Sequence, residues 1–307
     1  MEEKLWKSIS HNYVSLLEDI DTCDVTITVG KGEEIKIFRA HSLILRAQTP
    51  YFQTALSIQW GKMKDGKIVL EKPNISPDIF NDILIYIYSS EINFTGKSIH
   101  HILGILTAAD ELILPTLTEH VENFLIKNKT TLIQNHPVEV LKVSFQNEGW
   151  KKLQDNCISV ICSNPWMLFE SPLYYHLDSS IILAILKKDE LKMDESEIWY
   201  RILLWGISQD ELLPDDVTDW TQRDFDSLNR SFQLIYMKIY YGILFYPKDL
   251  KKILFFQNDI VIIHTIKLHH QKLWHIELLI RNMQTNQMLS EKLLLDHEFI
   301  AKYSSSI

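Results

Sequence analysis

The run from Phe38 to Phe52 places the end of a strand, a corner and the starts of two helices in one continuous stretch. Residues 35–37 alternate apolar and polar side chains, as a strand with one buried face does, and from Leu43 the apolar spacing becomes helical. Thr49 before Pro50 predicts a second helix, because threonine caps backbone N–H groups and proline has a φ suited to the first helical position. The run therefore predicts a packed corner between a sheet and two helices.

The elements on either side of this corner change in kind along the chain. Residues 25–29 alternate valine or isoleucine with threonine, and Gly30-Lys31-Gly32 supplies a turn, so we expect a β-hairpin with the strand at 35–38. Another short strand is predicted at 67–70. Helical spacing recurs at residues 5–20, 77–88, 99–113, 117–125, 138–145, 153–162, 181–186, 198–207, 225–235 and 250–256. Strands come first and helices dominate afterwards, which makes the fold class α+β.

The length and composition favour two folded domains in a reducing compartment. A chain of 307 residues exceeds the size of most single domains, and its 46% hydrophobic residues suffice for real cores. The three cysteines, Cys23, Cys157 and Cys162, show no paired spacing and are predicted to be buried free thiols. No leader is recognised at the N-terminus and no apolar run reaches the roughly 20 residues of a membrane span. We therefore expect a cytoplasmic or nuclear protein that does not enter a membrane.

The residues at and around the corner resemble the signature of BTB/POZ domains, in which a strand ending in Phe-x-Ala-His leads to two helices. The resemblance implies a small sheet covered by helices and assigns structural roles to Asp24, Phe38, His41, Pro50 and Phe52. It rests on segments in the same order as in the family: Asp24–Ile27, Phe38–Leu45, Thr49–Phe52, Ile75–Tyr88 and Leu106–Leu125.

The helical second half resembles the BACK domain that follows BTB in adaptor proteins, most clearly from Lys188 to Trp205. Trp220–Phe225 is similar to the extension of BTB–BACK proteins that carry a TLDc domain, although too few residues follow Leu250 for a full TLDc domain. The expected organisation is an N-terminal dimerisation helix (1–20), a BTB/POZ domain (21–127), an all-α BACK-like domain (128–250) and a divergent tail (251–307), for which a truncated module is one interpretation.

The amphipathic N-terminal helix needs a partner for its apolar stripe. From the residues alone it either packs on its own domain or buries the stripe against a second copy. BTB domains commonly dimerise through this helix, so the resemblance implies a homodimer. The implied interface consists of Leu5, Ile9, Tyr13, Leu16 and Leu17.

BTB–BACK proteins often connect substrates to a cullin-3 ubiquitin ligase through a hydrophobic-x-Glu motif after the second corner helix. The resemblance implies Ile58, Trp60 and Lys62 as cullin-binding candidates, with Lys62 in place of the glutamate. A lysine there weakens binding to a surface suited to a carboxylate. Trp60 is either a partner anchor or core filling. Ser42 stands where transcription-type BTB domains carry a basic residue beside the aspartate, which argues against a co-repressor pocket.

Catalytic, cofactor and metal sites are not predicted. His41 is expected to be a hydrogen-bonded structural residue, because no cysteine, serine or carboxylate constellation accompanies it. His100, His101 and the histidines of residues 264–275 lack metal-ligand spacing. A net charge of −9 argues against a general nucleic-acid binder.

These patterns favour a dimeric, non-enzymatic adaptor or scaffold with protein partners, most plausibly a substrate adaptor of a cullin-3-type ligase. The alternative is a cullin-independent BTB oligomerisation protein that has lost its C-terminal module.

Overall fold

The computed structural model describes residues 2–129, 131–210 and 212–214, together with Thr221, Arg223, Asp224 and Ser227. The chain divides into two compact units, Met1–Cys157 and Ile158 onward. The helices predicted at 225–235 and 250–256 lie outside the described residues, apart from Ser227.

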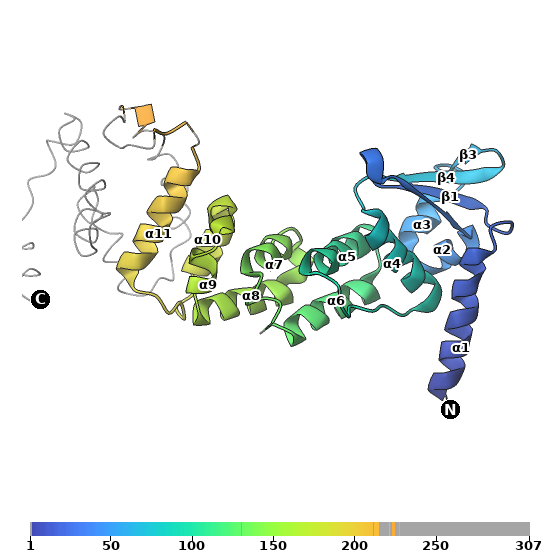
Figure 1. Ribbon diagram of the computed structural model, residues 1–307, viewed down its shortest axis with the longest axis horizontal. Coiled ribbons are helices and arrows are strands. Elements are labelled where there is room, and N and C mark those ends of the chain that lie inside the picture. The colour runs from blue at the N-terminus through green and yellow to red at the C-terminus, as the bar shows by residue number, and fades with distance from the viewer. Residues whose placement is uncertain are drawn as a thin grey trace, which may run out of the picture. The chain divides into compact units, whose positions relative to one another are not determined.

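The first unit contains a four-stranded sheet in the order β2-β1-β4-β3 (Figure 1). The strands are β1 (Val25–Val29), β2 (Lys36–Ala40), β3 (Lys62–Lys64) and β4 (Lys67–Lys72). β1 pairs antiparallel with β2, as the predicted hairpin requires, and parallel with β4, whereas β3 and β4 form a second antiparallel pair.

One face of this sheet carries the core of the unit. Val25, Ile27 and Val29 are fully buried, as are their neighbours Phe38 and Ala40 on β2, while the threonines between them on β1 are half-buried. Side chains of successive strand residues point to opposite faces. The alternation that predicted the hairpin therefore also determines which face meets the helices. Helices α2 (Ser42–Gln48) and α3 (Pro50–Ala55) lie against that face (Figure 1).

Prolines mark the starts of several helices in the first unit. Pro50, Pro77, Pro115 and Pro137 each occupy the first turn, where a missing N–H leaves no helical hydrogen bond unmade. The helices are α1 (Glu2–Ser15), α2 (Ser42–Gln48), α3 (Pro50–Ala55), α4 (Pro77–Ser89), α5 (Ile99–Glu111), α6 (Pro115–Lys127) and α7 (Pro137–Ser144), with 3-10 turns at Leu16–Glu18, Gly32–Glu34 and Glu148–Trp150.

Helix α8 (Lys151–Ser163) contains the division between the units, and the described remainder of the second unit is helical, as predicted. It comprises α9 (Trp166–Phe169), a 3-10 helix (Pro172–His176), α10 (Ser179–Leu186) and α11 (Glu195–Ser208). Trp205 Nε1 donates a hydrogen bond to the Leu177 carbonyl oxygen at 2.9 Å, and the rings of Phe169 and Tyr174 meet edge to face. These contacts place aromatic side chains at the centre of a helical core.

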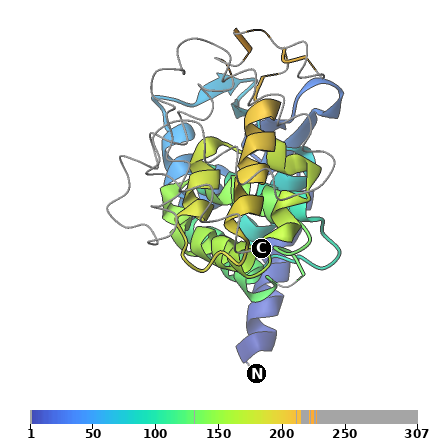
Figure 2. The same cartoon turned by 90° about the vertical axis from the view of Figure 1, so that its left-hand side faces the viewer.

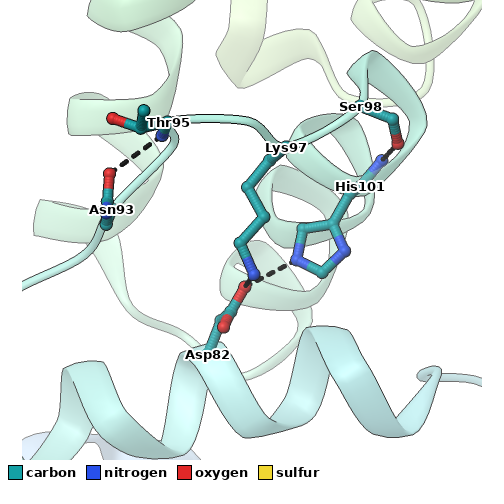
Figure 3. A network of polar contacts seen from close by, with 6 residues as sticks. All are labelled: Asp82, Asn93, Thr95, Lys97, Ser98 and His101. Atoms are coloured by element: carbon teal, nitrogen blue, oxygen red, sulfur yellow. Dashed lines mark hydrogen bonds and ion pairs between the residues drawn. The ribbon is translucent and has the colours of Figure 1, made fainter.

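An acidic side chain on α4 ties that helix to the start of α5. Asp82 Oδ2 accepts from Lys97 Nζ at 2.7 Å and from His101 Nε2 at 2.6 Å (Figure 3). Ser98 caps α5, because its hydroxyl oxygen accepts a hydrogen bond from the His101 backbone N–H. His101 thus has a structural contact, in keeping with its lack of metal-ligand spacing.

A buried ion pair joins the sheet to the helices. The side chain of Lys72 on β4 is 7% exposed, and its Nζ donates to Glu111 Oε1 at the end of α5 over 2.6 Å. The same ammonium lies 4.1 Å from the centre of the Tyr51 ring on α3. A buried charge is tolerated only when such partners replace its lost hydration.

We expect Glu111→Gln to lower the free energy of unfolding by about 2 kcal/mol, because it leaves the Lys72 ammonium buried without a counter-charge. Glu71→Gln is the control, since this acid is exposed on the same strand. Its effect is expected to stay within about 0.5 kcal/mol. Urea unfolding of the full chain measures both variants, and equal effects would contradict the role of the pair.

Candidate functional site

The strand-to-helix corner is built on two buried phenylalanines. Phe38 in the middle of β2 and Phe52 on α3 are 7% and 0% exposed, and the centre of the Phe38 ring lies 5.1 Å from that of Phe80. Thr49 caps α3 by accepting from the Tyr51 N–H and donates to the Leu112 carbonyl oxygen at 2.6 Å. The predicted N-cap therefore also fastens α3 to the end of α5.

His41 lies at the centre of this corner with both ring nitrogens hydrogen bonded. The Tyr88 hydroxyl oxygen accepts from the His41 backbone N–H at 2.8 Å and lies 2.9 Å from Nδ1, so the hydroxyl proton is directed at Nδ1. His41 Nε2 lies 2.9 Å from the Thr22 hydroxyl oxygen, which itself donates to the Asp19 carbonyl. In this pattern Nδ1 accepts from the Tyr88 hydroxyl and Nε2 faces the oxygen of the Thr22 hydroxyl, so both ring nitrogens have a hydrogen-bond partner.

The chemistry of the neighbouring groups also fits a structural role. Burial raises the pKa of the Tyr88 hydroxyl to about 12, which keeps its proton available to His41. Burial likewise raises the pKa of the Cys23 thiol, so the thiol that lies 4.0 Å from His41 Nε2 is not an activated nucleophile. The corner therefore holds the fold together and does not provide reactive groups.

Asp24, the residue just before β1, stabilises the start of α2. Its carboxylate accepts from the Ser42 backbone N–H at 2.7 Å and from the Ser42 hydroxyl. Burial raises the pKa of Asp24, but these hydrogen bonds outweigh burial and hold the pKa below its usual value. Ser42, which departs from the transcription-type pattern, thus donates two hydrogen bonds to the Asp24 carboxylate.

The predicted dimer face on the N-terminal helix is exposed. Ile9, Tyr13 and Leu16 are 47%, 49% and 36% exposed, and Leu17 is half-buried. A different face of α1, with Ser10 and Val14, lines a groove against α4. The side chain of Leu5 lies outside the described residues. The fold thus uses one side of α1, which projects from its unit (Figures 1 and 2), and leaves the apolar stripe without a partner in the described part of the chain.

The three cullin-binding candidates lie just beyond α3, at the surface. Ile58 is fully exposed and Trp60 is 70% exposed, in a turn closed by the Trp60 and Gly61 N–H groups donating to the Ser57 carbonyl oxygen. Of the two roles considered for Trp60, core filling is thereby excluded. Lys62 is also exposed and begins β3.

Strand β3 was not predicted from the sequence. It has three residues, all exposed, so it shows no alternation of burial. The Asp65-Gly66 pair was the available signal, because both residues adopt positive φ (51° and 75°), as a two-residue hairpin turn requires. This hairpin places Lys64 and Lys67 beside Lys62. Of these three lysines, the sequence indicated only Lys62 as a candidate site residue.

The described residues hold no other recognisable class of site. There, no group of three or more His, Cys, Asp or Glu side chains is arranged to hold a metal ion. In the same part of the chain, no helix is long and apolar enough to cross a membrane. Cys23, Cys157 and Cys162 are free and buried, as predicted.

We expect Tyr88→Phe to lower the free energy of unfolding by about 1–3 kcal/mol, because the His41 backbone N–H and Nδ1 lose their partner. Tyr86→Phe on the same helix is the control, since its hydroxyl makes no hydrogen bond among the described residues. Chemical denaturation measures both variants. A Tyr86 effect as large as that of Tyr88 would show that ring burial, not the hydroxyl, carries the stability.

Comparison with known proteins identifies the N-terminal part of the chain. The BTB/POZ domain model matches residues 13–129. Mouse Kelch-like protein 11 is 25% identical over 218 residues, which cover 70% of this chain and 28% of that protein. Kelch repeat and BTB domain-containing protein 2 of horsepox virus is 31% identical over 39% of this chain and 20% of its own length.

Among solved structures, the BTB domain of zebrafish PATZ1 shares 27% identity over 40% of this chain and 92% of that domain, with a TM-score of 0.32. The matches to the two curated relatives span less than a third of either one's length. The order of strand, corner and helices in the first unit, together with the family match, shows that residues 13–129 form a BTB/POZ domain.

Proposed function

We propose that this chain is a dimeric protein-interaction adaptor or scaffold. The observation that carries the proposal is an exposed stripe formed by Ile9 and Tyr13 on α1 and by Leu16 in the 3-10 turn that follows, while the other face of α1 packs on α4. Apolar side chains gathered on one exposed face mark an interaction site. A second copy satisfies the stripe through a symmetric contact, in which the same residues from both chains meet.

The helical segment after the BTB/POZ domain is proposed to be BACK-like over residues 128–250. Its support is the match to mouse Kelch-like protein 11, which is longer than the BTB/POZ match, and the all-helical described part of the second unit. Residues 251–307, proposed to be a divergent tail, lie outside the described residues. In this proposal the mechanism is positional: a dimer raises the effective concentration of bound partners near one another.

The proposed compartment is the cytoplasm or nucleus. Three buried free thiols suit a reducing environment, where disulfides are rare.

Dimerisation is tested by light scattering on the full chain at roughly tens of micromolar. We expect a dimer mass for the wild type and a shift to monomer, by at least about tenfold in dissociation constant, for Tyr13→Asp, which buries a charge in the interface. Ile113→Asp is the control, because Ile113 is also 49% exposed but lies at the end of α5. A strictly monomeric wild type would remove this part of the proposal.

Cullin-3 is the proposed partner of the surface formed by Ile58, Trp60 and Lys62. Exposed tryptophan is a frequent interface anchor, because a large ring buries much area at little cost in side-chain entropy. Lys62 opposes this assignment if the partner surface suits a carboxylate. The competing proposal is a cullin-independent scaffold, and Lys62 is the observation that favours it.

Titration with an N-terminal cullin-3 fragment separates these two proposals. The adaptor proposal expects measurable binding that Trp60→Ala weakens about tenfold or more, through loss of an anchor, and Lys62→Glu strengthens. Lys31→Glu, an exposed lysine in the β1–β2 turn, controls for net charge and is expected to change little. If the wild type does not bind the cullin-3 fragment and Lys62→Glu does not restore binding, the adaptor proposal is rejected in favour of the cullin-independent scaffold.

A further inference from the structure

The β3–β4 hairpin gathers basic side chains on the face of the sheet that the core does not use. In the strand register, Lys62 lies opposite Val69 and Lys64 lies opposite Lys67. Residues paired in this way project from the same face of a sheet. Across the sheet, Val69 is level with Thr26 on β1, and Thr26 is level with Arg39 on β2. Four cations therefore share one face, which we call the basic face: Arg39, Lys62, Lys64 and Lys67.

Three of the four cations of the basic face are close enough to act together. Neighbouring strands lie about 4.8 Å apart and residues two positions apart on a strand about 7 Å apart. Lys62, Lys64 and Lys67 on β3 and β4 are therefore within about one Debye length of one another, about 8–10 Å at physiological salt, and form one positive field. Arg39 on β2 lies three strand spacings, about 14 Å, from β3 and adds to this field more weakly. Arg39, Lys62 and Lys64 are exposed, Lys67 is half-buried, and none of the four forms an ion pair within the described residues.

The nearby carboxylates offset this charge only in part. Asp24 is held by Ser42, Asp65 lies at the hairpin turn, and Glu71 is two positions beyond Val69 along β4. Lys64 and Lys67 also face each other directly across the strands, an arrangement that destabilises a sheet when the charges are alike. An anionic partner would reduce the repulsion between Lys64 and Lys67. Partner binding therefore gives a physical reason for placing two lysines opposite each other, although the pair does not stabilise the fold.

The shape of the basic face indicates the kind of anion. Its cations lie in two rows, Arg39 with Lys62 and Lys67 with Lys64, separated by two residues along the strands. In an extended polypeptide, alternate side chains recur at the same spacing of about 7 Å. Val69 and the exposed Ile37 add apolar contact area on the same face. The overall charge of −9 repels nucleic acids and anionic membranes, whose charge extends far beyond this small patch.

We propose that the basic face binds an extended acidic segment of a partner protein. The inference rests on the protein-interaction role proposed above and does not require cullin-3. Carboxylates at alternate positions of the segment pair with the two rows of cations, and the side chains between them project away from the sheet. Because exposed ion pairs are individually weak, binding depends on several cations together and weakens with added salt.

The probe is a short fluorescein-labelled peptide that alternates glutamate and valine, titrated with the full chain and followed by fluorescence anisotropy. A peptide with glutamine in place of glutamate is its control. We expect binding of the acidic peptide alone, weakened about tenfold in the variant that combines Lys62→Gln, Lys64→Gln and Lys67→Gln. The variant combining Lys31→Gln, Lys127→Gln and Lys142→Gln has the same net charge at exposed sites elsewhere and is expected to bind within about twofold of wild type.

Four outcomes would overturn the inference: no binding of the acidic peptide, equal binding of the glutamine peptide, equal weakening in the two triple variants, or equally tight binding of a single-stranded DNA oligonucleotide. Misfolding is monitored by urea unfolding, in which the patch variant is expected to be at least as stable as wild type because it removes the Lys64–Lys67 repulsion. A chain that dimerises but does not bind the acidic peptide would overturn this inference and leave the dimer proposal in place. A monomeric chain that binds the peptide would instead refute the dimer proposal.

Discussion

The ammonium group of Lys72 lies where the sheet, α3 and α5 meet, and the first unit depends on how that charge is compensated. Lys72 continues the core-facing side of β4, paired in register with the fully buried Val29. Glu111 and the Tyr51 ring replace its hydration, and Thr49 adds a hydrogen bond to Leu112 at the same junction. Polar groups in such a place restrict how the elements can pack, because any other arrangement leaves a buried charge unpaired.

Around this junction, the sheet and α1 each bury one face against the rest of the unit and leave the opposite face exposed to solvent. The sheet turns Ile27 and Phe38 to the core and its basic face outward, while α1 packs on α4 and exposes Tyr13. The turn after α3 holds Trp60 away from the core. The exposed side of α1 is separate from the other two surfaces, whereas the turn with Trp60 adjoins the basic face at Lys62, which belongs to both.

Much of the BTB/POZ architecture could be predicted from local signals. The alternation in β1, the Thr49 cap and the prolines at helix starts act within a few residues, so a linear reading captures them. Strand β3 was not predicted, because all three of its residues are exposed and show no alternation. The Asp65-Gly66 turn was its one strong sequence signal. The candidate residues Trp60 and Lys62 were found by resemblance, but their exposure required the structure.

The sequence by itself determined the corner, the sequence of strands and helices, and the resemblance to BTB/POZ domains, because capping, proline geometry and hydrophobic periodicity are short-range properties of the chain. Only the tertiary structure decided which polar residues meet. The Lys72–Glu111 pair, the His41–Tyr88 hydrogen bonds and the alignment of Arg39 with Lys62 join residues from different elements. Those pairings follow from strand register and helix packing, which the linear spacing of charged and polar residues does not encode.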